Sequence, residues 1–146
     1  MADGPRRDEL RPFVRRESSP GRLVIAVRGG PDTIEKVRNH ASRTHRAFVL
    51  DGEPFWGISV SCALESTGPA SLESLLRQRF FSYALVHLPE VGALLDADFE
   101  LLPTFNNPHY TLRLATCDDA ELSRLLAALG QPRNNPYHGG GRSKRR

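Results

Sequence analysis

Strand-length apolar runs alternate with helical patterns along this chain, and glycine or proline separates most of them. The run LVIAVR at 23–28 stops at Gly29 and predicts a strand buried on both faces. Apolar residues at helical spacing then predict a helix over 32–46, opened by the capping-box-like pair Asp32 and Glu35. A chain with this alternation folds as layers of strands and helices around a shared core.

The later patterns continue this alternation. Turn-forming residues at 51–54 lie between two strand-like runs, AFVL and FWGISVSCAL, and predict a hairpin. The patterns that follow predict a helix at about 70–80, a strand in SYALVHL, a short helix in PEVGALLDA, strands in FELLP and HYTLRLA, and a last helix from Asp118. Because the order β-α-β-β-α-β-α-β-β-α is irregular, we predict an α+β fold with a mixed sheet and interleaved helices.

Length and composition predict one domain. The chain has 146 residues, 39% hydrophobic and 25% charged, as in ordinary globular proteins. Regular patterns are missing at both ends, so we expect a disordered leader at 1–21, a single domain at 22–133 and a flexible basic tail at 134–146. The N-terminus lacks the apolar core of a secretory signal and no apolar run reaches the length of a membrane span. A cytoplasmic protein without a membrane partner is expected.

The positive charge is concentrated at the ends of the chain. The net charge is +3, but the segment 23–130 has 9 basic and 13 acidic residues. The basic tail therefore predicts contact with polyanions without sequence specificity. Arginine makes up 18 of the 20 basic residues, a usage typical of GC-rich bacterial genomes, so a bacterial source is expected.

The helix at 32–46 carries the main concentration of basic residues within the expected domain. Lys36 and Arg43 fall on one side of it together with His40. Such a ridge can bind the phosphates of RNA or DNA, although a charged helix face is commonly only solvated. The nucleic-acid hypothesis assigns binding to four residues of this helix: Lys36, Arg38, Arg43 and Arg46.

A second candidate site is the turn between the first strand and the first helix. Glycines after a strand allow close backbone approach, the helix N-terminus attracts anions, and Arg28 adds a bidentate donor, so a phosphate could bind there. The alternative is a tight turn in which Arg28 forms a structural ion pair. The turn has neither the G-x-G-x-x-G pattern nor the lysine of a P-loop.

Other catalytic signals are incomplete. His109 and Thr111 form one H-x-T pattern, whereas two-histidine phosphoesterases use two, so a half-buried strand histidine is the alternative. The chain has no G-x-S-x-G motif of a serine hydrolase. Its five histidines and two cysteines are scattered, so no metal site is predicted.

Three short segments together resemble small ADP-ribosyltransferases of the Arg–Ser–Glu type. Arg28-Gly29 ends the first strand, GISVS contains Ser59 and Ser61, and DFELLP contains Glu100. The order and the separations agree over residues 23–103, with Val60 and Asp98 in place of the family's Thr and first Glu.

The resemblance implies an enzyme that uses NAD. Arg28 and Gly29 would bind the phosphates of NAD, while Ser59 and Glu100 would be catalytic, with Glu100 at the reacting ribose. Trp56 follows a turn and is our candidate for stacking on the cofactor.

Two hypotheses about function follow from the sequence. The protein is a small ADP-ribosyltransferase-like toxin or accessory protein that uses NAD, or a non-enzymatic module that binds RNA or DNA. A domain that binds only a protein target is a third class. The first hypothesis requires Arg28, Ser59 and Glu100 to meet in one cleft.

Overall fold

The computed structural model describes residues 7–15, 24–63 and 71–139, and the predicted single α+β domain is confirmed. Six strands form one antiparallel sheet in the order β7-β8-β5-β2-β6-β9. Its strands are β2 (Ile25–Gly30), β5 (Trp56–Ala63), β6 (Leu85–His87), β7 (Glu100–Pro103), β8 (His109–Leu114) and β9 (Arg133–Asn134).

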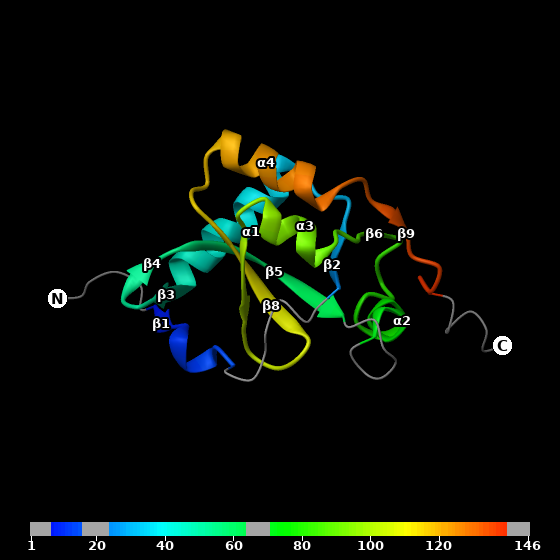
Figure 1. Ribbon diagram of the computed structural model, residues 1–146, viewed down its shortest axis with the longest axis horizontal. Helices are drawn as coiled ribbons and strands as arrows, with labels where there is room; N and C mark the ends of the chain where they lie inside the picture. The colour runs from blue at the N-terminus through cyan, green and yellow to red at the C-terminus, as the bar shows by residue number, and fades with distance from the viewer. Residues whose placement is uncertain (1–6, 16–23, 64–70, 140–146) are drawn as a thin grey trace.

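Three helices cover one face of this sheet, as Figure 1 shows. They are α1 (Ile34–Ala47), α3 (Val91–Asp96) and α4 (Asp119–Leu129). Inward-facing residues of β5 and β8 alternate with polar ones, and Ile58 and Leu112 bury their side chains completely against the helices. Helix α4 contributes Leu122 and Leu125 from the leucine stripe of its sequence.

A short helical segment covers the opposite face near β2 and β6. It starts as α2 (Leu72–Ser74) and continues as the π-helical turn η3 (Leu75–Arg79), close to the helix predicted at 70–80. Leu75 and Leu76 pack there against Val27 and Val86 in a second apolar cluster. The sheet is therefore covered on both faces around β2.

A small second sheet joins the N-terminal segment to the hairpin predicted around 51–54. It contains β1 (Asp8–Glu9), β3 (Phe48–Leu50) and β4 (Glu53–Pro54), with β1 and β3 parallel. Asp51 and Gly52 have φ angles of 56° and 81°, as a tight hairpin turn requires. The hairpin closes onto β4, whereas most of the run FWGISVSCAL enters the large sheet as β5.

The folded unit extends beyond both expected boundaries. At the N-terminus, β1 pairs with β3, the 3-10 turn η1 (Arg11–Phe13) follows, and Leu10 is only 1% exposed. At the C-terminus, β9 pairs with β6 and Asn135 is buried. A disordered leader over all of 1–21 and a flexible tail from 134 are thus corrected by main-chain pairing and by burial. Residues 1–6, 16–21 and 140–146 of those segments lie outside the described residues.

Strand β2 changes partner halfway along its length. Residues 25–27 pair with residues 61–63 of β5, whereas residues 28–30 pair with residues 85–87 of β6 on the other side. The two strands β2 and β5 therefore separate beyond Val27, and a gap opens in front of helix α1. None of the helices in the described ranges is long and apolar enough to cross a membrane.

Candidate functional site

A cavity of about 580 Å³ lies where β2 and β5 separate. Its walls come from five parts of the chain: the end of β2 with the following turn, helix α1, strand β5, strand β8, and the segment 79–83. The functional residues of α1 reach it because positions 36, 40 and 43 lie on one side of a helix whose other side packs through Val37 and Ala41.

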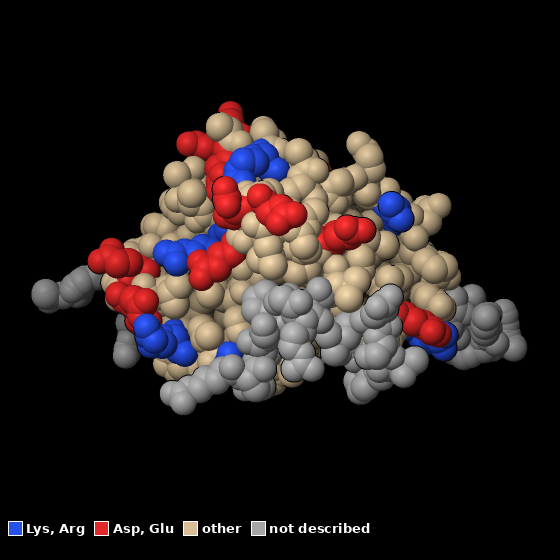
Figure 2. Space-filling model, in the orientation of Figure 1, with Lys and Arg blue, Asp and Glu red and all other residues tan. Residues whose placement is uncertain are grey.

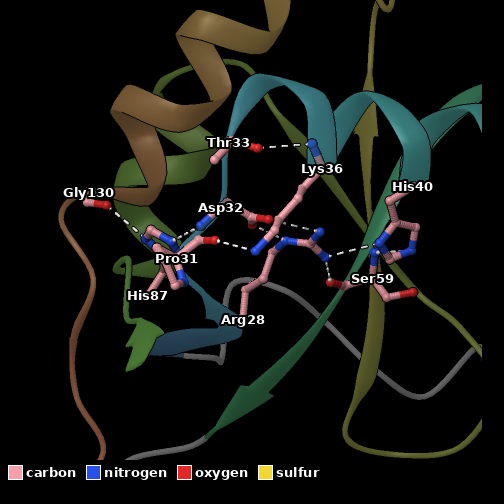
Figure 3. Close-up of polar contacts among 9 residues, drawn as sticks. All are labelled: Arg28, Pro31, Asp32, Thr33, Lys36, His40, Ser59, His87 and Gly130. Carbon is pink, nitrogen blue, oxygen red and sulfur yellow. Dashed lines mark hydrogen bonds and ion pairs between the residues drawn. The ribbon is translucent and has the colours of Figure 1, made fainter. Parts of the chain in front are cut away.

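The main chain of Ser59 is paired with side chains at this point. Its N–H lies 3.3 Å from Nε2 of His40, and its carbonyl oxygen accepts a hydrogen bond of 2.8 Å from Nη1 of Arg28 (Figure 3). These groups take the place of the main-chain partners that β2 would provide if it continued alongside β5. The two side chains therefore stabilise the gap that forms the cavity.

Arg28 also forms a buried ion pair with Asp32. Nε of Arg28 donates to Oδ2 of Asp32, and the two side chains are only 11% and 4% exposed. The guanidinium is thus occupied by Asp32 and by the Ser59 carbonyl. This geometry corresponds to the alternative of a structural ion pair in the turn, rather than to a donor free for a phosphate.

Main-chain N–H groups at the start of helix α1 also have acceptors within the protein. The main-chain N–H of Asp32 donates to Nε2 of His87 at 3.0 Å, and Nδ1 of His87 lies 2.8 Å from the carbonyl oxygen of Gly130. His87 is therefore the neutral tautomer protonated on Nδ1. Thr33, rather than Asp32, caps the helix, because its Oγ1 accepts from the N–H of Lys36. The N–H group of Asp32 consequently already has an acceptor within the protein.

His109 approaches Ser59 from strand β8. Its Nε2 lies 3.1 Å from Oγ of Ser59, and its Nδ1 lies 2.8 Å from Oγ1 of Thr104. Thr104 is completely buried, and its Oγ1 also lies 2.9 Å from Oγ1 of Thr111. A chain of hydrogen bonds thus holds the imidazole against the serine.

Both cavity histidines are neutral at pH 7. Burial, together with the positive charges of Arg28 and Arg43, lowers the pKa of His40 to about 4. Burial also lowers the pKa of His109, and the charge of Arg79 acts in the same direction. Arg43 of α1 and Arg79 of η3 therefore both impose a positive potential on the cavity.

Basic side chains outnumber acidic ones in the described lining of the cavity. Among the described residues of its lining, Asp32 is the one acidic residue, and Arg28 already neutralises it. Nζ of Lys36 has a main-chain acceptor, the Pro31 carbonyl at 3.2 Å, and no carboxylate partner in the described part of the chain. Arg43 and Arg79 are exposed, and within the described ranges neither has a carboxylate at ion-pair distance. Such a site attracts an anion.

The residues named by the resemblance are only partly brought together. Arg28, Gly29 and Ser59 line the cavity. Glu100 does not line it: its side chain is 56% exposed on the edge strand β7 and lies 3.5 Å from Arg113. Trp56 is also elsewhere, stacked on His45 with ring centroids 3.8 Å apart. The convergence that the NAD hypothesis requires is absent among these residues.

Only two of the four basic residues proposed on α1 line the cavity. Lys36 and Arg43 line the cavity, but Arg38 forms an ion pair with Asp119 of α4 and Arg46 is exposed outside the cavity. The four residues proposed for nucleic-acid binding thus do not form a single surface.

The sequence analysis gave no sign of several cavity residues. Arg79 and Tyr83 come from a segment with no recognisable motif, and Thr104 is one polar residue in a turn. His109 was noted through its H-x-T pattern, but its partner proved to be Ser59, a residue 50 positions away. Only the pairing of β5 with β8 brings the two together.

Comparison of the chain with protein-family models, with curated proteins and with solved structures gave no match. In the described part of the chain, no group of three or more His, Cys, Asp or Glu residues could hold a metal ion.

Proposed function

We propose that the cavity binds the phosphate group of a nucleotide. The observation that carries this proposal is the position of Arg43 and Arg79. They come from α1 and from the far end of η3, they line the same cavity, and they have no carboxylate partner among the described residues. A phosphate between them would neutralise charge that the fold itself leaves unbalanced.

An aromatic surface at the cavity supports a nucleotide over inorganic phosphate. Tyr83 lines the cavity and is 43% exposed. Its ring lies so close to Gly29 that a Cβ added there would come within 2.3 Å of Cε1. Phe80 supports the ring, with centroids 5.7 Å apart. A partly exposed ring held in this way offers a stacking surface to a base.

The size of the cavity and the mixed charge of the face drawn in Figure 2 favour a single nucleotide over a nucleic acid. Its volume of about 580 Å³ is that of a pocket for a small molecule. The face seen in Figure 2 mixes basic with acidic side chains, with carboxylates over α3 and the start of α4. Among the described residues, that face therefore has no continuous basic surface for a polymer.

NAD belongs to the proposed class of ligand, so binding of NAD remains part of the proposal. Transfer of ADP-ribose does not, because Glu100, the residue that the resemblance assigns to the reacting ribose, lies outside the cavity. The NAD hypothesis and the nucleic-acid hypothesis both require a bound phosphate, and the proposal keeps that ligand. It assigns the phosphate to Arg43 and Arg79 instead of Arg28.

Binding can be measured by thermal shift and calorimetry with ADP, NAD, inorganic phosphate and a short single-stranded RNA. We expect millimolar ADP to raise the melting temperature, and Arg43→Gln and Arg79→Gln each to weaken its binding about tenfold. Arg46→Gln is the matched control, since Arg46 is exposed on the same helix but outside the cavity. The proposal is overturned if no nucleotide binds, or if Arg46→Gln weakens binding as much as Arg43→Gln.

A further inference from the structure

We propose that Ser59 is a nucleophile activated by His109, and that it attacks the phosphorus of a phosphate ester bound in the cavity. This inference rests on the proposed function, because Arg43 and Arg79 are needed to hold the phosphate. It adds a reaction to a site that would otherwise only bind.

Ser59, His109 and Thr104 have the geometry of a nucleophile, a general base and a group that orients the base. Oγ of Ser59 lies 3.1 Å from Nε2 of His109, within reach for proton transfer. On the other side of the ring, Nδ1 lies 2.8 Å from the hydroxyl of Thr104, which is completely buried. Phe105 holds the ring edge-to-face at 5.0 Å. The imidazole is thus fixed on three sides.

The protonation state that the reaction needs is the one the surroundings favour. Burial lowers the pKa of His109, so the ring is neutral and can accept a proton, while a hydrogen bond with the main chain of Thr104 acts in the opposite direction. Nδ1 lies 2.8 Å from Oγ1 of Thr104, a hydroxyl that can accept the ring proton in a hydrogen bond, and the general-base role assigns the proton to this nitrogen. Nε2 is then the acceptor, and it faces the Ser59 hydroxyl.

The cavity brings the pair of Ser59 and His109 together with the two arginines that have no carboxylate partner among the described residues. Ser59 and His109 line the same space as Arg43 and Arg79, and Arg79 is close enough to influence His109 electrostatically. Cations near the nucleophile stabilise the charge of a phosphoryl group in its transition state. A serine activated for a neutral substrate would have no need of them.

The reaction balances with water as the second substrate. Oγ of Ser59 forms a bond to phosphorus while the bond from phosphorus to the ester oxygen breaks. The Ser59 proton passes to Nε2 of His109 and from there to the leaving oxygen. Water then attacks the phosphoserine, gives its proton to Nε2, and Oγ leaves and recovers that proton, so the products are an alcohol and a phosphate.

A fluorophosphonate probe tests the nucleophile directly, because it leaves a stable phosphonyl group on an activated serine. We expect the full-length protein to gain one probe mass, located by peptide mapping at Ser59. Ser59→Ala should abolish labelling and His109→Gln should slow it about 100-fold. Ser61→Ala is the matched control: Ser61 lines the same cavity and pairs with His109 through the strand register, but the hydroxyl that bonds to the imidazole is that of Ser59.

Thr104 is a positioning residue, and its role has its own readout. Thr104→Val, which keeps the shape but removes the hydroxyl, should slow labelling, and Thr104→Ser should restore it. Labelling at another residue, or equal labelling of wild type and His109→Gln, overturns the inference. The proposed function is judged separately by ADP binding to Ser59→Ala: if ADP still binds while wild type resists the probe, only the nucleophile is rejected.

Discussion

Nδ1 of His40 lies 3.2 Å from Nη1 of Arg28, a group that can only donate hydrogen bonds. The other ring nitrogen lies 3.3 Å from the Ser59 N–H, which is also a donor. A neutral imidazole has one nitrogen free to accept, so it satisfies one of these contacts at a time. A protonated imidazole satisfies neither, and it would lie beside the Arg28 charge. The arrangement of side chains that stabilises the gap between β2 and β5 therefore depends on a neutral His40.

This relationship predicts that the protein loses stability in mild acid. The pKa of His40 is about 4 in the folded protein, below its ordinary value of 6.5, so the unfolded chain binds more protons between these values. The free energy of unfolding should therefore rise from pH 4 to 6.5 and fall when acid is added. Urea denaturation across this range measures it.

The control for this prediction is a second histidine. His40→Gln should flatten the pH dependence, because glutamine has no titrating group, whereas His138→Gln, at an exposed position, should leave it as in wild type. Some dependence remains in His40→Gln because the pKa of His109 is also lowered, chiefly by burial. An identical slope for wild type and His40→Gln would contradict the prediction.

Arg28 should contribute to stability more than to ligand binding. Its ion pair with Asp32 is nearly buried, so Arg28→Met leaves a carboxylate without its partner and should cost about 3 kcal/mol of unfolding free energy. The double variant Arg28→Met, Asp32→Asn should lose less, because no uncompensated charge remains. Denaturation of both variants measures the difference. A stable Arg28→Met protein that binds ADP poorly would instead return Arg28 to the phosphate role.

The local pattern of the sequence predicts the elements well because short-range interactions form them. The last helix, expected from Asp118 onward, starts with that residue as its cap, whose Oδ1 accepts from the N–H of Glu121 at 2.9 Å. The first strand and the first helix were also expected within a few residues of β2 and α1. Caps, periodicity and turn residues act within one or two turns of chain, so they are legible in sequence.

The site was not predictable because long-range pairing builds it. Nothing in LVIAVRGG indicates that β2 leaves β5 after Val27, yet this change of partner opens the cavity. Leu10 lies in a segment without periodicity, and one buried leucine gives no pattern that sequence reasoning can use. Conversely, Glu100 and Arg28 agree in order with the resemblance, but order along a chain does not determine which strand edge a side chain occupies.

Asn135 should be essential for the segment that carries Arg79 and Tyr83. Its buried Nδ2 is within 3.2 Å of three carbonyl oxygens, those of Leu76, Phe80 and Tyr83. Asn135→Ala removes the amide donor from all three carbonyls, of which that of Phe80 keeps the N–H of Tyr83, and should lower the unfolding free energy by about 2 kcal/mol.

The neighbouring residue is the control for this effect. Asn134→Ala, at an exposed position of β9, should stay within about 0.5 kcal/mol of wild type. Truncation after Arg133 should destabilise at least as much as Asn135→Ala, since it removes the same side chain and part of β9. Equal melting temperatures for wild type and the truncated chain would show that the end of the fold does not hold the cavity wall.

Binding of phosphate should raise the pKa values of both cavity histidines. Burial and neighbouring arginines keep these pKa values low, and an anion in the cavity would offset the effect of Arg43 on His40 and of Arg79 on His109. In NMR titrations, the midpoints of the chemical-shift curves of the His40 and His109 ring protons should therefore move to higher pH when ADP is added. His138, which is exposed and outside the cavity lining, is an internal control in the same spectra. In Arg43→Gln the unliganded pKa of His40 should already be higher, because one of the charges that lowers it is gone. ADP binding that moves neither cavity histidine would place the phosphate away from Arg43 and Arg79.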